Sequence, residues 1–119
     1  MITQIKFASI AVDDQDRALA FYTEKLGFKV ASDQPFTDKI RWIELKIPGA
    51  DTKVVLFSPP GAKPGGFQNI VFQSDNVQKT FEELKARGVA FTQEPKSEQW
   101  GTSATFRDSE GNLFLISSK

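Results

Sequence analysis

Few side chains in this sequence are suited to chemistry, and Glu44 is the first of them. It lies in the segment RWIELKI (41–47), between Ile43 and Leu45. A carboxylate that points into a dry cavity could act as a base, because desolvation raises its pKa. A glutamate on a strand more often faces solvent or pairs with a neighbouring Lys or Arg, and we favour that interpretation.

Two arginines and two tryptophans are further candidates. Arg41 and Arg107 could hold an anionic ligand through paired hydrogen bonds, although solvated strand charges are the more common role. Trp42 and Trp100 offer rigid, flat surfaces that suit stacking on a planar ligand. Trp100 precedes a glycine at the expected start of a strand, and we give equal weight to a pocket wall and to structural packing there.

Composition excludes several classes of function. The chain has no histidine and no cysteine, which rules out a Ser–His pair, a thiolate nucleophile and a disulfide. No glycine-rich phosphate loop follows a strand. Lys+Arg and Asp+Glu both number 15, so we expect neither a nucleic-acid nor a membrane partner.

No apolar run approaches the ~20 residues of a membrane helix. The segment MITQIKF (1–7) lacks the pattern of a signal peptide, so we expect a cytoplasmic protein.

The elements that position these residues occur twice along the chain. In the first half, residues 5–12 have the composition of a strand. Asp14 is a predicted helix cap, an apolar stripe from Ala18 to Leu26 has helical spacing, and Gly27 ends the helix. Three further strands are predicted over 28–34, 39–47 and 52–58, with a turn at Pro48–Gly49.

The second half repeats this order after the segment PPGAKPGG (59–66), which we interpret as a linker. A strand over 67–74 precedes a helix that Asp75 or Asn76 caps and Gly88 ends. Strands follow over 89–95, 102–108 and 112–118, the last two joined by a turn at DSEGN (108–112). The repeat predicts an α+β fold: a single domain of two βαβββ half-modules, 1–58 and 67–119.

Two phrases of the sequence give a resemblance. DDQDRALAFYTEKLGF (13–28) and WGTSATFRDSEGNLFLI (100–116) resemble the vicinal oxygen chelate superfamily, which includes glyoxalase I, extradiol dioxygenases and bleomycin-resistance proteins. The resemblance covers essentially the whole chain. It implies tandem βαβββ modules that curl into an incomplete barrel, an active cup inside the barrel, and a homodimer.

The resemblance also implies four metal-ligand positions. They fall on Phe7 and Asn69, each seven residues before a predicted helix cap, and on Leu56 and Leu115 in the last strand of each half. The metal-using members carry His and Glu there, which suit Fe, Mn, Ni or Zn. Phenylalanine and leucine offer no donor atom, and asparagine offers one neutral oxygen. We therefore expect no metal and no other cofactor.

Strand alternation predicts what lines the cup instead. Side chains with the parity of Phe7 and Asn69 face it, which adds Ser9, Val71 and Gln73, and the closing strands add Val54, Leu56, Leu113 and Leu115. Such a mainly apolar cavity with a few polar groups is typical of a small-molecule site. The predicted ligand-binding residues are Phe7, Ser9, Leu56, Asn69, Gln73, Trp100 and Leu115.

Three hypotheses follow. The first is a metal-independent binder of a small, partly apolar and aromatic molecule, similar to bleomycin-resistance proteins. The second is a glyoxalase-like lyase or dioxygenase-type enzyme with an atypical metal or none. The third is a dimeric interaction module in which these residues fill the barrel as core. The sequence leaves open whether the modules pair within one chain or between two chains.

Overall fold

The computed structural model describes residues 1–58 and 60–119, and Pro59, the first residue of the predicted linker, lies outside the described residues. The chain divides into two compact units, Met1–Pro64 (unit 1) and Gly65–Lys119 (unit 2), and each is described by itself. No helix within the described ranges is long and apolar enough to cross a membrane. The prediction of a single domain with a linker over 59–66 stays a prediction.

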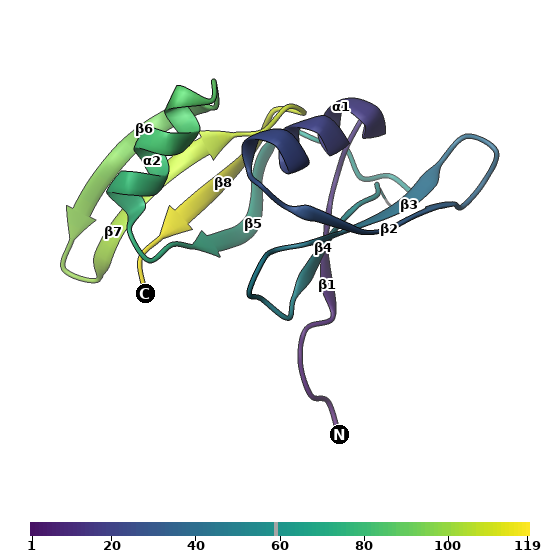
Figure 1. Ribbon diagram of the computed structural model, residues 1–119, viewed down its shortest axis with the longest axis horizontal. Helices are drawn as coiled ribbons and strands as arrows, with labels where there is room; N and C mark the ends of the chain where they lie inside the picture. The colour runs from purple at the N-terminus through teal and green to yellow at the C-terminus, as the bar shows by residue number, and fades with distance from the viewer. Residues whose placement is uncertain (59) are drawn as a thin grey trace. The chain divides into compact units, whose positions relative to one another are not determined.

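Unit 1 contains four strands and one helical segment (Figure 1). The elements are β1 (Phe7–Ile10), α1 (Gln15–Ala20), η1 (Phe21–Lys25), β2 (Lys29–Pro35), β3 (Arg41–Lys46) and β4 (Lys53–Leu56). The sheet order is β1-β4-β3-β2, with β1 parallel to β4 and the other neighbours antiparallel.

Unit 2 repeats this arrangement (Figure 1). Its elements are β5 (Gly66–Gln73), α2 (Val77–Ala86), β6 (Ala90–Glu98), β7 (Gly101–Arg107) and β8 (Asn112–Ser117). The order β5-β8-β7-β6, again with its first pair parallel, matches unit 1 strand for strand. The α+β class and the tandem βαβββ order are therefore confirmed.

Both helices begin where the sequence predicts. Asp14 caps α1 by accepting a hydrogen bond from the backbone N–H of Arg17 at 3.0 Å, and Asn76, rather than Asp75, caps α2 through Lys79 N–H at 3.0 Å. Each side chain satisfies a backbone donor that the first helical turn leaves without a partner. Gly27 and Gly88, with φ of +78° and +90°, follow the helix ends as predicted.

The helix of unit 1 differs from the prediction in its second half. Its last turns form the π-helical segment η1, in which Leu26 N–H donates to Phe21 O, five residues back. The consecutive residues Phe21 and Tyr22 are both buried there. A wider turn changes which side chains face the core, and the apolar spacing of the sequence did not distinguish it from an α-helix.

Each sheet has one face that forms the core of its unit. In unit 1 this face carries residues at 0–2% exposure, namely Ile10, Ile43, Leu45, Val54 and Leu56, and α1 lies against β4. In unit 2, α2 packs on β6 and β7 over a cluster of phenylalanines whose nearest ring centroids are 4.8–5.6 Å apart. Its members are Phe72, Phe81, Phe91, Phe106 and Phe114.

A buried polar cluster anchors the start of unit 2. Asn112 is fully buried at the beginning of β8, where its side chain donates to Asp108 Oδ2 (2.9 Å) and accepts from the backbone N–H of Gly65 (2.8 Å). Asp108 Oδ1 accepts from the backbone N–H groups of Glu110 and Asn112, both at 2.8 Å. The predicted turn at 108–112 is thus also the attachment point for the strand that opens this unit.

Candidate functional site: an aromatic face on unit 1

The second face of the unit 1 sheet carries rings instead of aliphatic core residues. Ser9 pairs with Val55, and Val55 pairs with Glu44, so these three side chains point to one face together with Phe7 and Trp42, which share their parity. Phe7, Trp42 and Glu44 are half-buried and Ser9 is exposed. Phe7 and Ser9 therefore lie on the sheet face away from the core, as predicted.

Four aromatic side chains contact one another on this face, and we call them the ring cluster: Phe7, Phe36, Trp42 and Phe57. Trp42 is central, with ring centroids 5.5 Å from Phe7, 5.2 Å from Phe57 and 6.3 Å from Phe36. Phe36 and Phe57 contact each other at 5.1 Å. Phe36 retains 59% of its surface exposed, so the cluster offers an accessible aromatic wall.

Glu44 belongs to this face and holds the central ring. Its Oε2 accepts a hydrogen bond from Trp42 Nε1 at 2.8 Å. The sequence favours a glutamate that faces solvent or pairs with a Lys or Arg. In the described residues no Lys or Arg forms an ion pair with Glu44, and its half-buried side chain lies on the sheet face away from the core. The hydrogen bond from Trp42 Nε1 to Glu44 holds the indole in the orientation in which it contacts the other three rings.

Leu56 does not lie where the sequence predicted. It pairs with Ile10 in the parallel β1–β4 ladder, so it faces the core side, away from Phe7. Val54 is on that side too, because it pairs with Ala8. The last-strand residue on the ring-bearing face is Val55, one position earlier. The prediction of a shared face for Phe7 and Leu56 is wrong because a one-residue slip in aligning a strand reverses every side chain.

Unit 2 presents a comparable sheet face. Leu115 pairs with Val71, and Gln73 pairs with Ser117, so Leu115, Val71 and Gln73 share one face as expected. Asn69 lies in a bulge between the pairs Phe67–Leu113 and Val71–Leu115, with a φ of +58°. Alternation does not apply inside a bulge, and such irregularities redirect side chains.

Trp100 is 60% exposed and lies in the turn that joins β6 and β7. Arg107 is also exposed and pairs with Leu113, on the face of Leu115. The ligand-binding roles predicted for the seven residues named from the sequence stay predictions.

The sequence reasoning missed Phe36 and Phe57, two members of the ring cluster. Phe57 could have been predicted, because it lies two residues after Val55 and strand alternation places both on the same face. Phe36 lies in the segment 32–39, and strand alternation does not specify the conformation of that segment.

The residues at the four family ligand positions do not fit a metal ion. Phe7, Leu115 and either Leu56 or Val55 provide no donor atom, and Asn69 provides one neutral oxygen. Across the described ranges 1–58 and 60–119, no three residues among His, Cys, Asp and Glu gather in a way that could hold an ion. We therefore derive no chemical step through a metal at this site.

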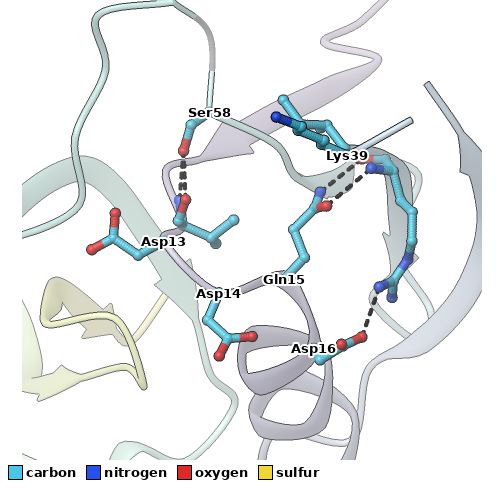
Figure 2. A pocket seen from close by; sticks show the side chains of 9 residues that line it. Asp13, Asp14, Gln15, Asp16, Lys39 and Ser58 are labelled. Atoms are coloured by element: carbon cyan, nitrogen blue, oxygen red, sulfur yellow. Dashed lines mark hydrogen bonds and ion pairs between the residues drawn. The ribbon is translucent and has the colours of Figure 1, made fainter. Parts of the chain in front are cut away.

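A polar pocket lies elsewhere in unit 1, at the beginning of α1 (Figure 2). Its volume is about 410 Å³ and its lining consists of Val12, Asp13, Asp14, Gln15, Asp16, Lys39, Ile40, Arg41 and Ser58. Several of its polar groups already bind one another. The Ser58 hydroxyl bridges Val12 N–H and O, and the Gln15 amide bridges the backbone of Arg41 and Leu56 O. These bonds make it a junction between β1, α1, β3 and β4.

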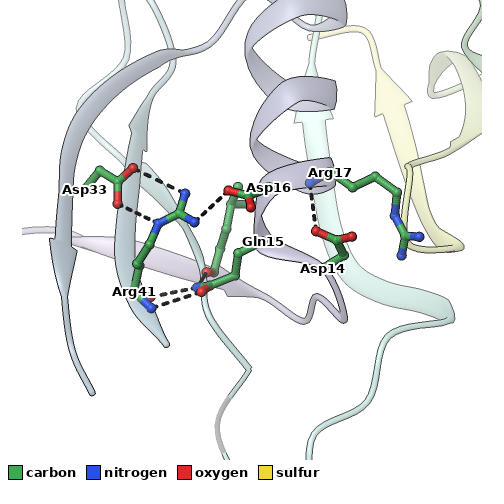
Figure 3. Close-up of polar contacts among 7 residues, drawn as sticks. Asp14, Gln15, Asp16, Arg17, Asp33 and Arg41 are labelled. Atoms are coloured by element: carbon green, nitrogen blue, oxygen red, sulfur yellow. Dashed lines mark hydrogen bonds and ion pairs between the residues drawn. The ribbon is translucent and has the colours of Figure 1, made fainter. Parts of the chain in front are cut away.

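Arg41 is held by two carboxylates at this junction (Figure 3). Its Nη1 lies 2.7 Å from Asp16 Oδ1, and its Nε lies 3.0 Å from Asp33 Oδ1. The hydrogen bond to Asp33, followed by that to Asp16, raises the pKa of Arg41 above its ordinary value. The guanidinium is thus engaged within the protein, which argues against the anion-holding role that the sequence allowed for it.

Comparison with known proteins shows which family the chain belongs to. The sequence profile of the glyoxalase/bleomycin resistance protein/dioxygenase superfamily matches residues 4–116. The chain belongs to this superfamily. The chain is also 39% identical over 119 residues to the uncharacterized protein YetH of Bacillus subtilis (strain 168), with 98% of both chains covered.

Two solved structures have a fold similar to that of this chain. A superfamily member from Sphaerobacter thermophilus DSM 20745 superimposes with a TM-score of 0.91 at 32% identity, covering 99% of this chain and 98% of that one. TnmS3 from Streptomyces sp. CB03234, described as an antibiotic binding protein, has a TM-score of 0.83 at 34% identity, with coverages of 98% and 96%. The predicted family and fold are confirmed.

Proposed function

We propose that this protein is a metal-independent small-molecule-binding protein whose ligand is partly apolar and carries a planar aromatic portion. The observation that carries the proposal is the ring cluster of unit 1, on the sheet face that does not form the core. Binding sites for such ligands combine aromatic walls with a few polar groups, and Ser9 and Glu44 are the polar side chains that share this face. TnmS3, the antibiotic binding protein at 34% identity, supports a small-molecule ligand.

Metal independence is supported by the donor set, since the side chains at the family ligand positions are Phe7, Asn69 and aliphatic residues. Elemental analysis of the purified protein should find no stoichiometric transition metal, and a chelator should leave ligand affinity unchanged. A stoichiometric metal that is lost in Asn69→Ala would contradict this part. Cytoplasmic location and homodimer formation belong to the proposal as well, supported by the cysteine-free sequence and by the family.

A screen of planar natural products by thermal shift tests ligand binding. A ligand at a hundredfold excess over its Kd should stabilise the protein by about 2.7 kcal/mol. No shift across a broad collection of such compounds would contradict the proposal.

The two tryptophans allow the site to be located. The chain contains only Trp42 and Trp100. Trp100→Phe therefore leaves Trp42 as the only indole fluorophore, and Trp42→Phe leaves Trp100. We expect a bound aromatic ligand to quench the emission of Trp42. Trp42→Leu should weaken binding about tenfold, because it removes the central stacking surface. Quenching of Trp100 alone would move the site to unit 2.

A further inference from the structure

A row of three lysines crosses the ring-bearing face of unit 1. Lys29 of β2 pairs with Lys46 of β3, and Lys46 pairs with Lys53 of β4. Directly paired residues on neighbouring strands point to the same face, so the three ammonium groups share one row. Like charges in directly opposed positions destabilise a sheet. This lysine row (Lys29, Lys46 and Lys53) therefore lowers the stability of the fold, and stability does not explain why three lysines occupy these positions.

The lysine row is continuous with the ring cluster. Lys53 also pairs with Phe7 of β1, so the row runs from the aromatic side chain across three more strands. Along β3, Lys46 lies four residues from Trp42, about 13 Å on a strand. On β3 this interval holds Glu44, but Phe7, whose ring contacts Trp42, pairs directly with Lys53 and brings the aromatic surface to the row. An extended ligand stacked on the rings would therefore reach the ammonium groups.

Charges on this face do not compensate the lysines. Among the paired strand positions of the face, the charged residues are the three lysines and Glu44. In the ranges that the structure describes, none of the three lysines forms an ion pair, and Glu44 uses Oε2 to accept from Trp42. Two positive charges thus remain in excess here, although the whole chain has a formal charge of zero. The field of this face attracts anions.

We propose that the lysine row is the anion-binding end of the aromatic site, so that the ligand is a planar aromatic molecule bearing a carboxylate or phosphate group. This inference rests on the proposed function and names its ligand class. The aromatic portion lies on the ring cluster, and the anionic group lies at Lys46 and Lys53. An ammonium group is a compact charge with three donors, and it accommodates both kinds of anion. Ligand binding also relieves the repulsion within the row, so stability that is lost in the free protein is regained in the complex.

Two probes of the same shape and different charge test the inference. 9-Anthracenecarboxylate and 9-anthracenemethanol share a three-ring system, and isothermal titration calorimetry measures the affinity of each. We expect the carboxylate to bind about tenfold more tightly in low salt. At 0.5 M NaCl its advantage should shrink, because screening shortens the range of charge interactions to about 4 Å, while the affinity of the alcohol should stay the same. A second pair, 1-naphthoate and 1-naphthyl phosphate, reports which anion the row prefers, and either preference agrees with the proposal.

The variant Lys46→Gln/Lys53→Gln assigns the effect to the row. It should lose the preference for 9-anthracenecarboxylate, with about a threefold loss of affinity for each lysine, and should bind 9-anthracenemethanol as the wild type does. Its melting temperature should be equal or higher, since like-charge repulsion is removed. Lys63→Gln removes one charge from an exposed position of the same unit and should change neither affinity.

The outcomes separate the two proposals. Equal affinity for the acid and the alcohol would overturn the anionic ligand and leave the aromatic binding function standing. A preference for the acid that persists in Lys46→Gln/Lys53→Gln would place the anion elsewhere and would also overturn the inference. Failure of both anthracene probes to bind would overturn the inference and count against the binding function itself.

Discussion

Phe7 and Trp42 contact each other across the strand that carries Val55. Phe7 belongs to β1 and Trp42 to β3, and the strand between them is β4, whose Val55 points to the same face. The two rings meet at a centroid distance of 5.5 Å, and Val55 has no exposed surface. The neighbouring residue Leu56 is equally buried but faces the core. Two adjacent, fully buried aliphatic residues thus support different parts of the molecule.

This arrangement predicts different effects for Val55→Ala and Leu56→Ala. Leu56→Ala should lower the free energy of unfolding by about 2–5 kcal/mol, because it leaves a cavity in the core. It should leave the affinity of the folded protein for a planar aromatic probe unchanged. Val55→Ala should weaken that affinity, since the Phe7–Trp42 contact loses its support. Urea denaturation and fluorescence titration of both variants measure the two quantities. Weaker binding in Leu56→Ala, with normal binding in Val55→Ala, would contradict the observed register.

The elements of the fold were predictable because each has a local signal. The caps at Asp14 and Asn76 and the glycines at 27 and 88 delimit both helices in the sequence. The duplication gave independent support, since the same order had to explain both halves. Strand alternation also predicted correctly which residues of one strand share a face, as for Phe7 with Ser9 and for Val71 with Gln73.

The candidate site was less predictable because it depends on relations between strands. Parity fixes which residues of one strand share a face, but the register of β4 against β1 decides whether Val55 or Leu56 joins Phe7. The lysine row has the same origin, since pairing in three strands brings Lys29, Lys46 and Lys53 together. Phe36 reaches the cluster from a loop, where no periodicity operates.

Asn69 should tolerate glycine better than alanine. Its φ of +58° is in the left-handed region, which costs roughly 1–2 kcal/mol for an ordinary residue and little for Asn or Gly. We expect Asn69→Ala to lower the free energy of unfolding by about 1 kcal/mol and Asn69→Gly to change it by less than about 0.5 kcal/mol. Urea denaturation of both variants beside the wild type measures this. Equal loss in both Asn69 variants would show that the side chain, and not the backbone conformation, is what matters.

Asn112→Ala should destabilise the protein through its hydrogen bonds. The change removes the acceptor for Gly65 N–H and the donor to Asp108 Oδ2 in a fully buried place. The expected loss is about 1–3 kcal/mol, because buried polar groups that lose a partner keep their desolvation cost. Ser109→Ala, in the same turn, loses only a bond to the adjacent Glu110 and should cost less than about 0.5 kcal/mol. Equal stabilities of the two variants in urea would contradict the role of Asn112 as an anchor.

Arg41→Gln should reduce stability modestly, and by less at high salt. The side chain of Arg41 is 34% exposed and that of Asp16 is 83% exposed, so the network is partly screened and should contribute no more than about 1 kcal/mol.

Hydrogen bonding to Asp33 and Asp16 raises the pKa of Arg41 in the folded state above its value in the unfolded chain. A raised pKa means that the stabilisation is complete below the pKa of the unfolded chain, which is already strongly alkaline for arginine, and is lost only as the pH rises through the folded value. The titration of Arg41 itself therefore predicts a constant difference between wild type and Arg41→Gln from pH 6 to pH 10. Urea denaturation across that range, at 0.05 and 0.5 M NaCl, measures it. A difference that salt leaves unchanged would show that Arg41 stabilises the junction by packing rather than by charge.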